Sequence, residues 1–97
     1  REITPDLILQ IVSDHLNIQS IDILGQKRNK EIATARQIVM YLCRTMTSTP
    51  LQQIGKFLGG RDHTTVIHGI EKITKDIPKD LALQNTIDIL KKKINPQ

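Results

Sequence analysis

Residues 49–75 read TPLQQIGKFLGGRDHTTVIHGIEKITK and predict two helices joined by a glycine-containing turn. The first helix is short, and its apolar face at helical spacing consists of Leu51, Ile54, Phe57 and Leu58. Gly59-Gly60 ends it, because glycine easily adopts the left-handed geometry found after many helices. Thr49-Pro50-Leu51-Gln52 has the form of a capping box, so we expect Thr49 to cap the helix and Pro50 to be its first residue. Short helix, tight turn and longer helix together are the outline of a helix-turn-helix.

The second helix of this pair should start at Asp62, and its first turn contains no apolar side chain. It reads Asp62-His63-Thr64-Thr65, and the apolar stripe begins only at Val66. A recognition helix presents its first residues to base edges in the major groove, where Asp can accept from cytosine N4 and Thr can contact a base or a thymine methyl. The same residues fit a purely structural interpretation, in which Asp62 is an N-cap and the threonines are ordinary first-turn residues. The pattern alone leaves both interpretations open.

The sequence on either side of this pair predicts further helices. Thr4-Pro5 is typical of an N-cap followed by the first helical residue. Apolar spacing and stop signals then predict helices at 5–16, 20–24 and 31–47, with a last helix after Pro78. A polar, basic loop at 26–30 connects the second and third of these. We therefore expect an all-α fold of about six helices in a single domain, residues 1–97.

The positive charge is unevenly distributed, although the net charge is only +4. Residues 25–45 alone carry a net charge of +4, while residues 1–24 are net acidic. Such a concentration is expected if one face of the protein meets an anion. An ordinary solvated basic surface would explain the same excess.

Other classes of function find less support in the sequence. No phosphate-binding loop, metal-ligand set or nucleophile with an adjacent base is recognisable, so we expect neither an enzyme nor a metal site. His63 and His68 are five residues apart and cannot share a metal as an i, i+4 pair would. Cys43, the single cysteine, lies in an apolar stripe and should be buried. No apolar run reaches the ~20 residues of a membrane span. A helical protein-interaction module is the alternative, although exposed apolar anchors would be more typical of it.

The segment Gly59–His68, GGRDHTTVIH, resembles the signature of bacterial DnaA replication initiators. The similarity is strongest over residues 26–75, where the other matching segments are Gln26-Lys27-Arg28, Ala35-Arg36-Gln37-Ile38, Met40-Tyr41-Leu42 and Leu51-x-x-Ile54-Gly55. The resemblance implies a Trp-repressor-like helix-turn-helix domain, the C-terminal domain of such a protein. It also implies binding of double-stranded DNA at the DnaA boxes of a replication origin, for initiation of chromosomal replication.

The resemblance further implies roles for individual residues. Asp62, His63 and Thr64 would read bases in the major groove. Arg28 would enter the minor groove, which is narrow and electronegative in AT-rich DNA. Phosphate contacts are implied for Arg36, Gln37 and Arg44, with Lys27 assisting. Contacts to thymine methyls are implied for Leu51 and for the position of Gln52, and Thr65 would contact a thymine methyl or the DNA backbone.

Some positions depart from the family or stay ambiguous. Gln52 replaces a frequent proline, so a methyl contact there is in doubt, and Glu31 adds a negative charge beside the basic loop. Gly69 lies inside a helix at a cost of ~1 kcal/mol relative to alanine, for which we expect close helix packing as the reason. For Arg61 we favour a structural role, a salt bridge that stabilises the turn, rather than a base contact. For His68 the sequence favours neither a structural role nor a DNA contact.

A longer protein is implied as well, since the chain starts at Arg1. In the resembling family an ATP-binding AAA+ domain precedes this domain, and protomers assemble through domains absent here. We expect no cofactor for this part, a monomeric state, and a cytoplasmic, nucleoid-associated location in a bacterium.

Overall fold

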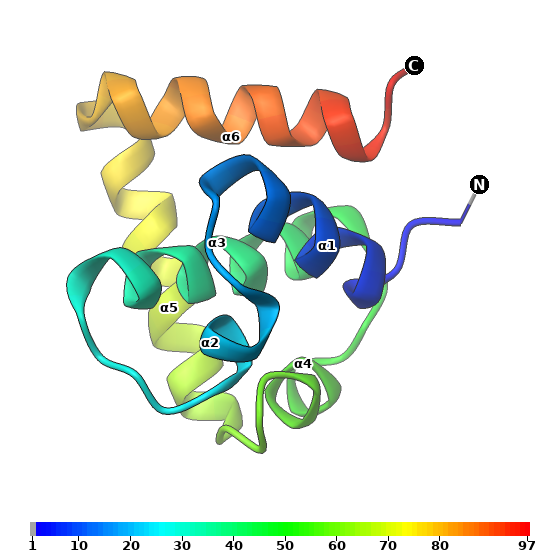
Figure 1. The fold of residues 1–97 in the computed structure, drawn as a ribbon, viewed down its shortest axis with the longest axis vertical. Coiled ribbons are helices and arrows are strands. Elements are labelled where there is room, and N and C mark those ends of the chain that lie inside the picture. Colours follow the sequence, from blue (N-terminus) through cyan, green and yellow to red (C-terminus); the bar gives the residue numbers. More distant parts are fainter. Residues whose placement is uncertain (1) are drawn as a thin grey trace.

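The computed structural model describes residues 2–97, which form six α-helices and one short 3₁₀ helix (Figure 1). The α-helices are α1 (Pro5–Leu16), α2 (Ser20–Leu24), α3 (Lys30–Met46), α4 (Leu51–Phe57), α5 (His63–Asp76) and α6 (Leu81–Ile94). The 3₁₀ helix η1 (Ile77–Lys79) lies at Pro78, where the sequence predicted an interruption. The expected all-α fold of about six helices is therefore confirmed.

Local signals place the ends of the first two helices as expected. Thr4 caps α1, because its hydroxyl oxygen accepts from the Leu7 backbone N–H at 3.2 Å. Asn17 follows α1 in the left-handed conformation, with φ of 55°. Gly25 follows the last residue of α2.

The predicted capping box at the start of α4 is wrong. The helix begins at Leu51 rather than Pro50, and no side chain caps it. Thr49 is engaged elsewhere, since its backbone N–H donates to Thr47 Oγ1 at 3.1 Å and the two hydroxyl oxygens lie 2.8 Å apart. The Thr47 hydroxyl in turn donates to the Cys43 carbonyl. The Thr49 hydroxyl, which the capping box would need, is therefore hydrogen-bonded within the turn after α3.

The core surrounds α3, which packs mainly against α5 and α1. Cys43 is fully buried on this helix, as predicted, and burial raises the pKa of its thiol to about 12. α5 crosses α3 closely at Gly69, where an added Cβ would overlap the Met40 sulfur. The buried side chains of α5 are Val66 and Ile73, whereas Ile70 of α5 and Ile77 of η1 are only partly buried. Close helix packing therefore explains the helical glycine.

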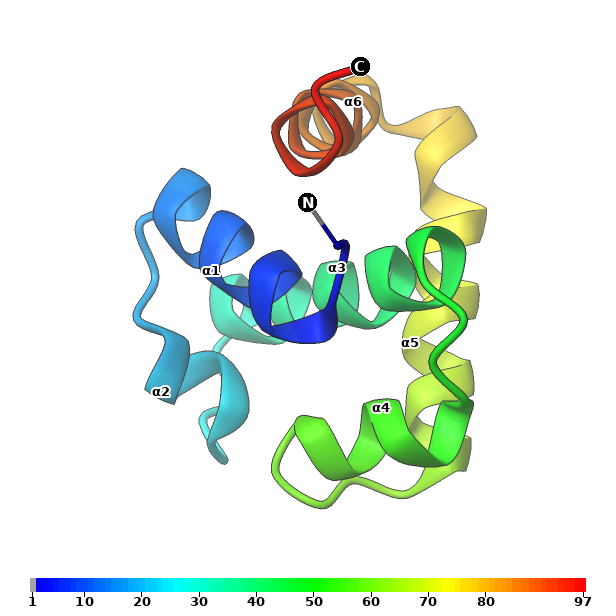
Figure 2. The same ribbon diagram turned by 90° about the vertical axis from the view of Figure 1, so that its right-hand side faces the viewer.

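Different helices form the two ends of the molecule. In Figures 1 and 2, α6 lies across one end, while α4 and the start of α5 lie at the opposite end. The loop between α2 and α3 extends toward that same opposite end.

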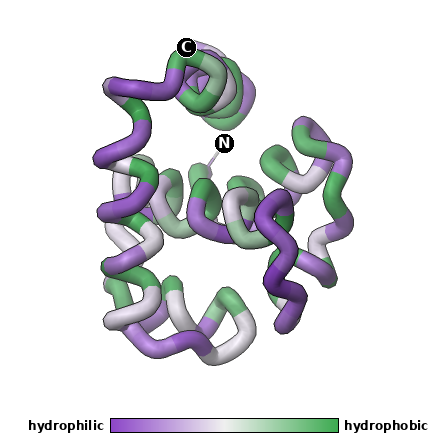
Figure 3. The backbone as a smooth tube through the Cα atoms, turned by 90° about the vertical axis from the view of Figure 1, so that its left-hand side faces the viewer, coloured by the Kyte–Doolittle hydropathy of each residue, from purple (hydrophilic) through white to green (hydrophobic). Residues whose placement is uncertain are grey.

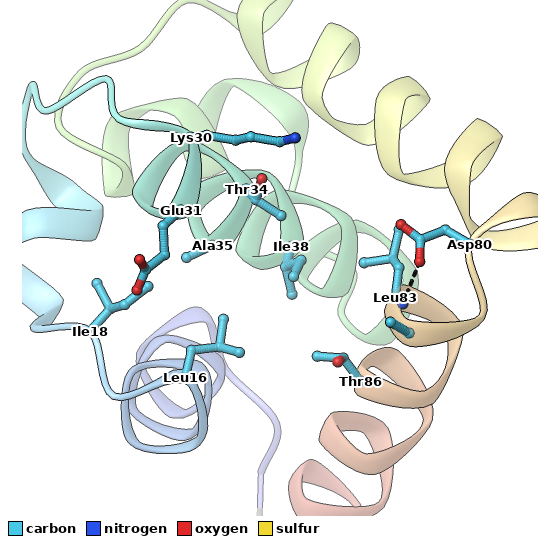
Figure 4. A pocket seen from close by; sticks show the side chains of 11 residues that line it. Leu16, Ile18, Lys30, Glu31, Thr34, Ala35, Ile38, Asp80, Leu83 and Thr86 are labelled. Carbon is cyan, nitrogen blue, oxygen red and sulfur yellow. Dashed lines mark hydrogen bonds between the residues drawn. The ribbon is translucent and has the colours of Figure 1, made fainter.

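An open, largely apolar pocket of about 550 Å³ lies where the end of α1, the start of α3 and the start of α6 meet (Figure 4). Leu16, Ile38 and Leu83 line it, and Asp80 caps α6 at its edge by accepting from the Leu83 backbone N–H at 3.0 Å. None of the residues expected to contact DNA lines this pocket.

Candidate nucleic-acid interface

The first turn of α5 is exposed along its whole length. Asp62, His63, Thr64 and Thr65 are all exposed, and Val66 is the first buried residue of the helix. Asp62 caps the helix, because its Oδ1 accepts from the Thr64 backbone N–H at 3.3 Å. Its carboxylate also lies 3.1 Å from Nδ1 of His63. The structural role considered for Asp62 is thus present, and the side chains of the next three residues face solvent.

The turn between α4 and α5 depends on glycine at three positions. Gly59 and Gly60 have φ of 76° and 82°, a region that other residues seldom adopt. The Gly55 carbonyl accepts from the backbone N–H groups of Gly60 at 3.1 Å and Arg61 at 2.8 Å. This folds the chain back so closely that a Cβ on Gly55 would overlap the Arg61 carbonyl oxygen. The turn therefore sets the angle at which α5 leaves α4.

Replacing Gly55 with alanine should destabilise the domain, although alanine is the better helix former. The Cβ must displace backbone, and overpacking of this kind costs about 1–3 kcal/mol in the free energy of unfolding. Urea unfolding measures the change, with the exposed Gln53→Ala in the same helix as control. A gain of ~1 kcal/mol, as helix propensity alone would give, would contradict the close approach at Gly55.

Arg61 holds this turn to the end of α2. Its Nη1 donates to the Leu58 carbonyl at 2.6 Å and to the Leu24 carbonyl at 3.4 Å, and its Nη2 donates to the Gly25 carbonyl at 2.5 Å. The structural role that we favoured from the sequence is therefore present. Its partners are backbone carbonyls rather than the carboxylate of a salt bridge.

Arg36 does not have the exposure that the expected phosphate contact requires. It is 7% exposed, and its guanidinium donates to four backbone carbonyls of the segment before Arg28. Nε donates to Ile23 at 2.7 Å, and Nη2 donates to Asp22 at 3.1 Å, Gly25 at 3.1 Å and Lys27 at 3.0 Å. Burial, and secondarily the positive charge of Arg61, lower the pKa of Arg36. Arg36 thus holds the basic loop from inside the protein, and its phosphate contact stays a prediction that this burial disfavours.

The basic loop itself is exposed. Figure 3 shows it as a strongly hydrophilic segment that protrudes from the body of the molecule. Arg28 is exposed, and Lys27 is exposed but lies 3.2 Å from the Asp22 carboxylate. An exposed ion pair of this kind is worth about 1 kcal/mol at most, so Lys27 can exchange Asp22 for another anion.

The other residues expected to contact DNA lie on α3, α4 and α5 and do not form one cluster. Arg44 is exposed in the last turn of α3, while Leu51 is half-buried and Gln52 exposed in the first turn of α4. Gln37 is half-buried and Thr65 is exposed in a groove between α3 and α5.

The groove is also lined by Arg36 and Arg61, and by two exposed residues that the sequence did not assign to DNA. His68 and Lys72 line it beside Gln37 and Thr65, and both are exposed. The spacing 65, 68 and 72 places three side chains on one face of a helix, and this signal could have identified them. Lys72 also pairs with Asp76 at 2.6 Å, which lowers the pKa of that carboxyl.

No three His, Cys, Asp or Glu side chains within residues 2–97 come together in a way that could hold a metal ion. No helix in this range has the length and apolar character needed to span a bilayer.

Comparison with known proteins agrees with the geometry. The family model described as bacterial dnaA protein helix-turn-helix matches residues 5–73. The chain is 52% identical over 96 residues to the chromosomal replication initiator protein DnaA of Lachnoclostridium phytofermentans, covering 99% of this chain and 21% of that protein. It is 50% identical over 90 residues to the protein of the same name from Oenococcus oeni, covering 93% of this chain and 20% of that protein.

A solved structure of similar fold points in the same direction. A crystal structure of a DNA replication initiation factor superimposes with a TM-score of 0.79 at 34% identity, over 93% of this chain and 28% of the other. The chain thus spans about a fifth of the length of the curated relatives that it matches. It belongs to the bacterial DnaA family, of which it forms the C-terminal helix-turn-helix, DNA-binding domain.

Proposed function

We propose that this domain binds double-stranded DNA sequence-specifically, at the DnaA boxes of a bacterial replication origin. The observation that carries the proposal is the exposed first turn of α5, which presents polar side chains without an apolar one among them. A major groove about 12 Å wide admits a helix, and its donor and acceptor pattern distinguishes all four base pairs. We assign the reading of bases there to Asp62, His63 and Thr64.

The contact between Asp62 and His63 makes the proposed reading chemically specific. When the imidazole is neutral, a carboxylate beside Nδ1 favours the tautomer with the proton on that nitrogen. Nε2 is then an acceptor, which suits the exocyclic amino groups of adenine or cytosine. The threonine hydroxyl and methyl groups add a polar and an apolar contact within the same turn.

A second contact is proposed for the basic loop, with Arg28 in the adjacent minor groove. This loop and the start of α5 lie at the same end of the molecule (Figure 2). Both could therefore approach one duplex from one side. The attraction of a narrow, electronegative minor groove for arginine supports this assignment.

Phosphate contacts are proposed for the exposed or half-exposed polar side chains around these two readers. They are Lys27, Gln37, Arg44, Thr65, His68 and Lys72, with Leu51 and Gln52 against sugars or thymine methyls. Such contacts position the protein without carrying sequence information. A single helix-turn-helix suits an asymmetric site, so we propose one monomer per box.

The rest of such a protein lies outside residues 1–97. The much greater length of the relatives leaves room for the ATP-binding AAA+ domain and the protomer contacts expected from the resemblance. We propose that this domain delivers that assembly to origin DNA in the bacterial cytoplasm, on the nucleoid, and needs no cofactor of its own.

The direct test is binding of the domain to a short duplex with a DnaA box and to a scrambled duplex of equal length. A specific reader should prefer the box by at least about a thousandfold at physiological salt. Sedimentation should find one domain per box. Equal affinity for both duplexes would contradict the proposed function.

Arg28→Ala should weaken discrimination at one end of the box only. The loss should be about 1–3 kcal/mol for the base pairs beside the minor-groove contact. A set of duplexes with single base-pair substitutions measures it. Lys30→Ala removes a nearby exposed lysine and serves as the matched control, which should lower all affinities evenly. Unchanged relative affinities in Arg28→Ala would count against the minor-groove role.

A further inference from the structure

Two arginines, Arg36 buried and Arg61 half-buried, donate to the same backbone atom. The Gly25 carbonyl accepts from Nη2 of Arg36 at 3.1 Å and from Nη2 of Arg61 at 2.5 Å. Arg36 comes from α3, and Arg61 comes from the turn of the helix-turn-helix. A single acceptor therefore joins the basic loop, the long helix and the turn before α5. We call Arg36, Arg61 and the carbonyls of residues 22–25, 27 and 58 the arginine clamp.

The clamp extends to the residue immediately before Arg28. Nη2 of Arg36 donates to the Lys27 carbonyl at 3.0 Å. That carbonyl shares one planar peptide unit with the Arg28 backbone N–H, so orienting one orients the other. The Arg28 side chain itself stays exposed. The peptide unit between Lys27 and Arg28 is thus oriented by a contact inside the protein, while the Arg28 side chain is accessible to a ligand.

The turn between α4 and α5 also packs closely against the end of α2. A Cβ on Gly59 would overlap the Leu24 carbonyl oxygen, so the turn and the end of α2 are in direct contact. Arg61 donates to the carbonyls of Leu24 and Gly25 on one side of this contact and to that of Leu58 on the other. Planar guanidinium groups suit such multiple donation, whereas a lysine ammonium cannot span the same set of acceptors.

We propose that Arg61 is a positioning residue for minor-groove reading. Through the clamp it fixes where Arg28 lies relative to the first turn of α5, without contacting DNA itself. A loop held in advance loses less conformational entropy on binding than a loop that must be ordered by the DNA. The proposal rests on the proposed function, because it assigns a position to the same two readers.

The test uses Arg61→Lys and Arg61→Met against a full set of single base-pair variants of the box. Arg61→Lys keeps the positive charge, so the dependence of affinity on salt should stay as in the wild type. Discrimination should fall about tenfold at the base pairs that Arg28→Ala identifies, and persist at those that His63→Ala identifies. A double variant of Arg28→Ala with either Arg61 change should lose no more at those base pairs than Arg28→Ala alone, because coupled residues are not additive.

The controls separate positioning from charge and from folding. Lys75→Arg makes the reverse exchange at an exposed lysine that has no proposed DNA contact, in the last turn of α5, and should leave the base-pair profile unchanged. Circular dichroism melting establishes that each variant is folded at the assay temperature. If Arg61→Met is unfolded there, Arg61→Lys alone decides.

Three results would overturn the proposal. They are an even loss at all base pairs, additive losses with Arg28→Ala, and a profile like the wild type. Failure of the proposed function looks different, since the wild-type domain would then show no preference for the box at all.

Discussion

Replacing both His63 and Thr64 with alanine should reduce the preference for a DnaA box over random DNA by about 2–6 kcal/mol, since each lost base contact costs roughly 1–3 kcal/mol. Both side chains are exposed in the first turn of α5, and neither contributes to the core. Alanine is a good helix former, and the exposed contact between His63 and Asp62 is worth about 1 kcal/mol at most. The double variant should therefore melt close to the wild-type temperature.

The measurement is the ratio of box affinity to random-DNA affinity, alongside thermal melting. Binding to random DNA should change little, because it depends on phosphates. Thr74→Ala makes the same exchange near the other end of α5 and is the matched control. Asp62→Asn is informative as well, since asparagine still caps a helix but changes the acceptor pattern. If the double variant keeps the wild-type ratio, α5 does not read DNA.

Replacing Arg36 with methionine should lower the free energy of unfolding by about 2–4 kcal/mol, because a buried charged donor serves four carbonyls at once. Methionine keeps much of the aliphatic length but offers no donor. The carbonyls of residues 22–27 would then have to find water, and the basic loop would lose its support. Box affinity should fall as a consequence, mainly at the base pairs that depend on Arg28.

Urea unfolding of Arg36→Met and Arg44→Met separates the two arginines of α3. Arg44 is exposed, so its replacement should change stability by no more than about 0.5 kcal/mol. Arg44→Met should instead reduce the salt dependence of DNA binding by about one counterion. If Arg36→Met keeps wild-type stability but reduces the salt dependence of DNA binding, Arg36 contacts a DNA phosphate instead of holding the loop.

Much of this molecule was predictable from short stretches of sequence. Thr4-Pro5 marks the start of α1, Gly25 follows α2, and Gly59-Gly60 ends α4. The residue types at 62–65 suffice to predict the polar first turn of α5, and helical spacing predicts the apolar stripe that starts at Val66. These features depend on hydrogen bonds and packing within one or two turns of helix, so local residue types are enough to specify them.

The same local reasoning failed at two turns. The Thr49 capping box is complete in sequence, but the turn after α3 engages the threonine first. The sequence could not show how close Gly55 comes to the Arg61 carbonyl, because that approach depends on how the whole turn folds back.

The two arginines of α3 show most clearly what only the tertiary structure decided. Arg36 and Arg44 share a residue type and a helix, and the family resemblance implied phosphate contacts for both. Arg36 is buried only because α2 and the loop after it fold over α3 and direct four carbonyls at its guanidinium. No such segment covers Arg44, which stays exposed. Whether a charge is buried depends on the acceptors that the fold brings to it, and those acceptors lie 9 to 14 residues away in the chain, beyond the reach of local propensity.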